Sequence, residues 1–256
     1  MSESASSSSD LSAQKAGRGI VWRGGLYTAL FLVVGLVIGF FAGAGLEGSL
    51  PRHTPATTRQ VLAAVPVLLI LVAASALWGR QMARLTGSAA TRRMAWAGVL
   101  SYAPAVILVG FGLTLLEVAL VEEGRGPDWP IHVVYTLLFT PAAFLIAGLG
   151  GLALGLANRS GRLAGRLFLF VGLAGGLAFL AVDLVMDALG WRVGAPGAVA
   201  RVTMLTVTLV GDLAAALVSG TVLATLLSRH VRQGQPQIER GVTTQPETRF
   251  FSGQPS

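Results

Sequence analysis

Long apolar runs separated by short polar segments repeat six times along this chain. The runs cover residues 24–44, 61–78, 94–116, 131–157, 165–189 and 199–227. Crossing a hydrocarbon core about 30 Å thick takes about 20 helical residues, because each residue adds about 1.5 Å. The second run is the shortest, and all six reach or approach that length. The pattern predicts an all-α fold, a polytopic transmembrane bundle of six helices within residues 21–228.

Composition supports lipid as the main surroundings of this chain. Charged residues make up only 12% of it, whereas soluble domains usually carry about 25%. The formal net charge is +7, which in a soluble protein would point to nucleic acid. Here the basic residues flank the apolar runs, so the expected partner is the lipid bilayer with its anionic headgroups, and not nucleic acid. The predicted location is the cell (inner or plasma) membrane, with multiple crossings.

The two ends of the chain have a different composition from the apolar runs. Residues 1–20 begin with a serine-rich polar stretch, and residues 229–256 are basic at first and then rich in Gln, Pro, Gly and Thr. Segments with so few apolar residues cannot bury enough surface to offset the entropy of ordering. Both are predicted to be disordered tails.

The first apolar run has a second interpretation, as a signal peptide. The small residues Ala42, Gly43 and Ala44 follow an apolar run, as they would at a cleavage site. The polar lead before the run is long, however, and the run exceeds the 7–15 residues of a usual signal-peptide core. The sequence therefore favours a first helix that stays in the protein.

Basic residues are distributed unevenly between alternate loops. Counting the N-terminal tail as the first segment, fourteen lie on one side: Lys15, Arg18, Arg23, Arg80, Arg84, Arg92, Arg93, Arg159, Arg162, Arg166, Arg229, Arg232, Arg240 and Arg249. Five lie on the other side: Arg52, Arg59, Arg125, Arg192 and Arg201. Loops rich in Lys and Arg stay in the cytoplasm during insertion. Both termini are therefore predicted to be cytoplasmic.

Small residues at four-residue spacing mark helix-packing stripes. The first run carries Gly35, Gly39 and Gly43, and the fourth carries Gly151 and Gly155. Such stripes let two backbones approach closely, so that van der Waals contact drives association within the membrane. Some of these stripes must pack inside the bundle. A stripe left over on the first helix would offer a face for a homo-oligomer or for a partner membrane subunit.

Acidic residues are the chemically unusual groups within the apolar runs. Asp183 and Asp187 lie one turn apart in the fifth run, Glu117 closes the third, and Asp212 lies near the middle of the sixth. At about 1.5 Å per residue, Asp212 lies about 18–20 Å from the outer end of its helix. An intramembrane Asp costs about 2.5–3.5 kcal/mol on insertion scales, and such residues usually mark function. Thr208, one turn earlier, is placed to hydrogen-bond it.

Three interpretations of these acids remain open. In the first, Asp212, Asp183 and Thr208 form an ion or proton site in a transporter. In the second, the acids are structural, with Asp187 paired to Arg192 or Arg201 and Asp212 bonded across helices.

In the third, the two aspartates are a catalytic dyad. Val210-Gly211-Asp212 partly resembles the Gly-x-Gly-Asp motif of intramembrane aspartyl proteases. The motif's first glycine is replaced by Leu209, and Val182 precedes Asp183 where that family has Tyr. No later run carries the family's Pro-Ala-Leu motif.

Several other activities lack the residues that they need. The chain has no Cys, and His53, His132 and His230 lie outside the runs or at a helix end, so we expect no metal site, no haem and no other cofactor. No nucleotide-binding motif is present, and no catalytic residues are assigned. The helix number resembles that of the substrate-binding subunits of energy-coupling-factor transporters. The sequence thus favours a small permease or transporter component, with a non-catalytic scaffold of a membrane complex as the alternative.

Overall fold

The computed structural model describes residues 19–51, 53–117, 131–191 and 198–234, and this part of the chain is helical without strands. The first long helix, Gly19–Ser49, contains a π-helical segment, η1 (Ala29–Val34), followed by α2 (Gly35–Ser49). The others are α3 (Ala56–Thr86), α4 (Thr91–Glu117), α5 (Ile131–Ala157), α6 (Gly161–Ala188) and α7 (Ala198–Gly234). These bounds confirm the predicted all-α fold with six helices. The two predicted tails lie almost entirely outside the described residues.

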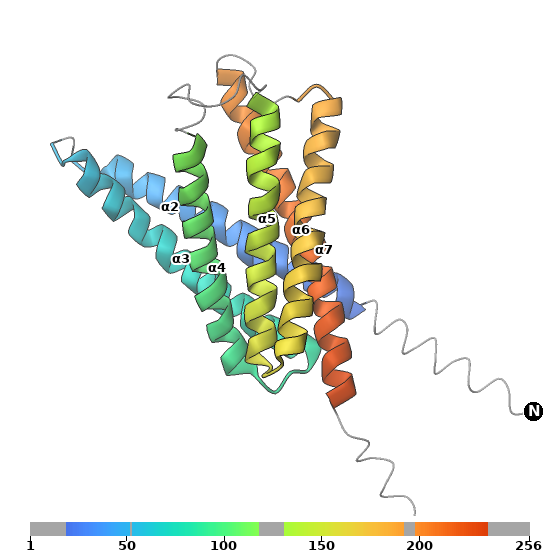
Figure 1. Cartoon of the computed structure of the whole chain (residues 1–256). Helices are drawn as coiled ribbons and strands as arrows, with labels where there is room; N and C mark the ends of the chain where they lie inside the picture. The colour runs from blue at the N-terminus through green and yellow to red at the C-terminus, as the bar shows by residue number, and fades with distance from the viewer. Residues whose placement is uncertain (1–18, 52, 118–130, 192–197, 235–256) are drawn as a thin grey trace, which may run out of the picture.

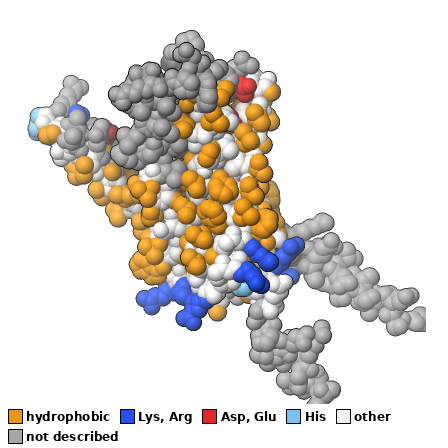
Figure 2. Space-filling model, in the orientation of Figure 1, with side chains coloured by type: hydrophobic (Ala, Val, Ile, Leu, Met, Phe, Trp, Pro, Cys, Tyr) orange, Lys and Arg blue, Asp and Glu red, His pale blue; other side chains and the backbone are white. Residues whose placement is uncertain are grey.

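Five of the six helices are long and apolar enough to cross a membrane, which makes this a multi-pass membrane protein. The sixth, α4, has 27 residues, a length that also reaches across a bilayer. Large apolar side chains cover the middle of the molecule and face outward (Figure 2), among them Leu108 at 72% exposure and Leu100 at 70%. In water such a surface would be unstable, so lipid must be its solvent.

The helices are arranged in a closed circuit. Each helix packs against the next along the chain, and α7 returns to pack against η1 in the first helix. Figure 1 shows α4, α5 and α6 running side by side, whereas α2 and α3 lean away from them toward one end. The circuit leaves room at its centre for groups from all six helices to meet.

One end of the bundle is rich in arginine. Figure 2 shows Arg side chains gathered at the end where the first helix begins and α7 finishes. A hollow at this end is lined by residues from both, including Ile20, Trp22, Arg229 and Arg232. The two ends of the described chain therefore lie together at the arginine-rich end. That this end faces the cytoplasm stays a prediction. Reporter fusions that place the two chain ends on opposite faces of the membrane would contradict it.

Glycine allows the closest helix contacts in the bundle. A Cβ added to Gly151 or Gly155 of α5 would meet backbone atoms of α6, at Leu167 and Ala164 respectively. On the first helix, a Cβ at Gly35 would lie 2.7 Å from the Cβ of Ala74, and one at Gly43 would lie 2.7 Å from the Ala63 oxygen. The stripe of Gly35, Gly39 and Gly43 thus faces α3, where it takes part in internal packing.

Candidate functional site

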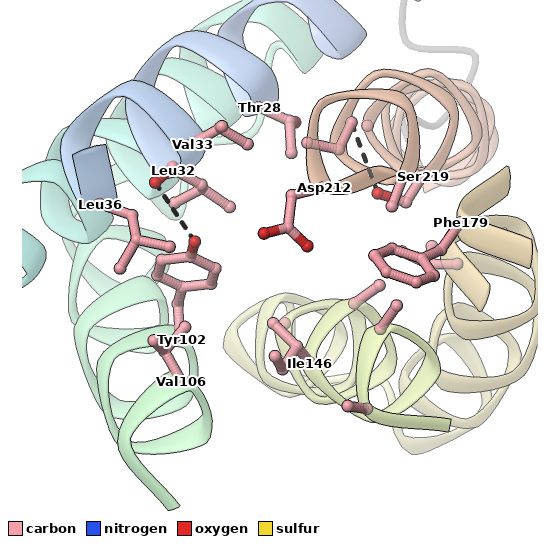
Figure 3. Close-up of a pocket in the computed structure, with 18 of the residues that line it drawn as sticks. Thr28, Leu32, Val33, Leu36, Tyr102, Val106, Ile146, Phe179, Asp212 and Ser219 are labelled. Atoms are coloured by element: carbon pink, nitrogen blue, oxygen red, sulfur yellow. Dashed lines mark hydrogen bonds between the residues drawn. The ribbon is translucent and has the colours of Figure 1, made fainter. Parts of the chain in front are cut away.

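A cavity of about 260 Å³ lies at the centre of the helix circuit (Figure 3). All six helices contribute to its walls, and most of the lining side chains are apolar. The first helix supplies Thr28 and Leu32, α3 supplies Trp78, and α4 supplies Tyr102. The remaining wall comes from α5, α6 and α7. The cavity is therefore a feature of the whole bundle and not of one helix pair.

Asp212 of α7 carries its carboxyl into this cavity. In Figure 3 the side chain projects from α7 toward the space between Tyr102 and Phe179. Of the described residues that line the cavity, Asp212 is the only Asp, Glu, Lys, Arg or His. No hydrogen bond to the carboxyl is drawn among the residues of Figure 3. A carboxyl group thus faces an apolar space within the membrane-spanning region.

Three hydrogen bonds fix the walls near the first helix. The indole Nε1 of Trp78 donates to Thr28 Oγ1 at 3.0 Å, and that hydroxyl donates to the Gly24 oxygen at 2.9 Å. The Tyr102 hydroxyl donates to the Leu32 oxygen at 3.3 Å. Leu32 lies in η1, and π-helical segments are rare and often occur at functional sites. These bonds join the first helix to α3 and α4 beside the cavity.

An aromatic cluster of Tyr135, Phe139 and Phe179 borders the cavity toward the arginine-poor end. The Tyr135 and Phe139 rings stack with centroids 4.3 Å apart, and Phe179 lies 6.4 Å from both. A Cβ at Gly211 would lie 2.7 Å from the Phe179 ring. Gly211 is therefore needed for Phe179 to approach α7, next to Asp212. The small residue before Asp212 thus has a packing role of its own.

A polar layer lies along the same helices, one turn beyond Phe179. Asp183 of α6 is buried at 8% exposure and accepts a hydrogen bond from the Thr136 hydroxyl of α5. The Tyr135 and Thr208 hydroxyls share a hydrogen bond of 2.5 Å between α5 and α7. These two contacts tie α5, α6 and α7 together. Asp183 thus has a local partner on α5.

The structure brings only part of the predicted site together. Asp212 and Thr208 both line the cavity, whereas Asp183 is not among its lining residues. Thr208 bonds Tyr135, and the predicted contact between Thr208 and Asp212 is not among those described. The side chains of Glu117, Arg192 and Arg201 lie outside the described residues, so the pairing of Asp187 with Arg192 or Arg201 stays a prediction.

Several residues of the site carry no signal in the sequence. Trp78 and Tyr102 are aromatic residues within apolar runs, and nothing in their spacing marks them as cavity-lining. The π-helical segment also has no sequence signature. Asp212 was identified because an ionisable group in an apolar run is costly, and Thr208 because it lies one turn away.

Comparison with known proteins adds no family to this description. No family model, no curated protein and no solved structure matches the chain.

The chemistry open to this cavity follows from its lining. A carboxyl group among apolar and aromatic side chains can bind a proton or a cation. Within the described part of the chain, no three His, Cys, Asp or Glu residues come together as metal ligands would. Thr28, Thr208, Ser219 and Tyr102 add hydroxyl groups to the lining.

Proposed function

We propose that this protein is a small permease or transporter component in which Asp212 is the proton-binding or cation-binding group. The observation that carries the proposal is the Asp212 carboxyl, which faces a central cavity lined by all six helices. Intramembrane acids that face a bundle interior commonly mark ion pathways and proton relays. We further propose that the protein resides in the cell membrane with its arginine-rich end in the cytoplasm, as the arginine distribution predicts.

Proton flux into liposomes tests this proposal. The purified protein is reconstituted into vesicles that contain a pH-sensitive dye, and a potassium gradient with valinomycin makes the interior negative. We expect protein-dependent acidification that Asp212→Asn abolishes, because an amide, unlike a carboxyl group, does not take up and release a proton. Glu47→Gln is the matched control, since Glu47 is an exposed acid of α2 outside the cavity lining.

Two results would contradict the proposal. One is acidification by the unchanged protein no faster than in protein-free vesicles. The other is full acidification by Asp212→Asn, which would show that protons move without this carboxyl.

A further inference from the structure

We propose that the cavity binds a small organic monocation with an apolar body, whose ammonium group pairs with Asp212 in place of a proton. The inference rests on the proposed function and names the substrate class of the same site. Three features of the cavity support it: its single charge, its aromatic walls and its size.

The charge pattern around Asp212 favours one positive charge in the bound molecule. Among the described lining residues, the first helix, α3, α5 and α6 bring no Asp, Glu, Lys, Arg or His to the cavity. Tyr102 of α4 is the other titratable group that faces it, and its hydroxyl donates to the Leu32 oxygen. An ammonium group would therefore find one carboxylate and no competing cation among these residues. An anion or a dication would leave a charge unpaired in a low-dielectric space.

The walls favour an organic cation over a metal ion. Four aromatic residues line the cavity, from α3, α4, α5 and α6: Trp78, Tyr102, Phe139 and Phe179. Aromatic ring faces attract ammonium groups within about 6 Å of the ring centroid. Calcium needs 6–8 oxygen ligands, as a general rule, and magnesium an octahedron of them. A single carboxylate with a few hydroxyls among aromatic and aliphatic side chains suits the organic cation better.

The size of the cavity limits the bound molecule. A cavity of about 150 Å³ binds benzene, so 260 Å³ has room for a benzene-sized ring with a short arm. A phenyl ring with a two-carbon ammonium arm has this scale. Phenethylammonium is therefore a suitable probe, and phenethyl alcohol is its neutral counterpart of similar shape.

Equilibrium dialysis of the detergent-purified full chain with these two labelled probes tests the inference. The unchanged protein should bind phenethylammonium about tenfold or more tightly than the alcohol, since a charge-assisted contact is added. Lowering the pH should weaken binding of the cation and not of the alcohol, because protons compete for the carboxylate. Asp212→Asn should bind both probes equally, whereas Glu47→Gln should keep the preference.

The outcomes separate this inference from the proposed function. Equal affinity of the unchanged protein for both probes, or no saturable binding of either, would overturn the inference without reference to any variant. Preference for the cation that survives in Asp212→Asn would also overturn it. Proton flux without cation preference would leave the proposed function in place, and cation preference without proton flux would contradict proton transport and leave Asp212 as a cation-binding group.

Discussion

Replacing Asp212 by leucine should make the protein more resistant to heat while removing the proposed proton flux. An acid in the middle of a membrane helix costs about 2.5–3.5 kcal/mol on insertion scales, and Figure 3 draws no hydrogen bond that offsets this cost. The cavity of 260 Å³ has room for the apolar side chain. We expect a gain of about 1–3 kcal/mol in the free energy of unfolding, since the desolvation cost disappears. Thermal unfolding in detergent, followed by tryptophan fluorescence, measures it.

Asp183→Leu is the matched comparison, and it should change stability in the opposite direction. Asp183 is buried and accepts a hydrogen bond from Thr136, which the variant loses. Removing one partner of a buried hydrogen bond costs about 1–3 kcal/mol. If Asp212→Leu instead lowers the melting temperature as much as Asp183→Leu does, Asp212 has a structural role and the cavity site is contradicted.

The second large effect concerns the crossing between the first helix and α7. A Cβ at Gly220 would overlap the Thr28 side chain and lie 2.8 Å from the Gly24 oxygen. A Cβ at Gly25 would lie 2.6 Å from the Leu217 oxygen, so neither backbone has room to give way. Gly220→Leu should therefore prevent α7 from packing on the first helix and open the circuit. Overpacking usually costs about 1–3 kcal/mol, and a clash with backbone should exceed that range.

Gly165→Leu on α6 provides the control for this prediction, because a Cβ there would meet nothing within 4 Å. Size-exclusion chromatography of the membrane extract should recover the control as a single sharp peak. The Gly220 variant should be lost to aggregate or elute as a broad species. Equal recovery and equal melting temperatures for the two variants would mean that this crossing does not hold the bundle closed.

Hydropathy predicted the number and class of the helices better than their ends. The second run ended at residue 78, whereas α3 continues to Thr86 and includes Arg80 and Arg84. Likewise, α7 continues to Gly234 and includes Arg229 and Arg232. Apolar runs mark the part of a helix in hydrocarbon, whereas backbone hydrogen bonding continues into the interface, where long basic side chains reach the headgroups. Some of the basic residues that the sequence analysis placed in loops and tails therefore belong to the last turns of helices.

The cavity was less predictable than the acid within it. Along α7, Leu209, Val210 and Leu213 face outward, whereas Val207 and Ala215 are buried. All of these residues are apolar, so the sequence gives no sign of which face a helix turns toward lipid. Asp212 could be identified from the sequence because an ionisable side chain within a membrane helix is costly. Its aromatic neighbours Trp78 and Tyr102 come from other helices, and only the packing of the whole circuit brings them there.

The central claim is that Asp212 faces a cavity that admits small cations within the membrane. Because the chain has no Cys, single cysteines along α7 report access without a background signal. Labelling of the protein in membranes with a small cationic thiosulfonate reagent measures this access, since thiolates form and react only where water reaches. Cysteine at Asp212, Ala216 or Ser219 should be modified, and cysteine at Leu209 or Leu213 should not. If all five cysteines are equally protected from the reagent, or if only those at Leu209 and Leu213 are modified, the account is contradicted.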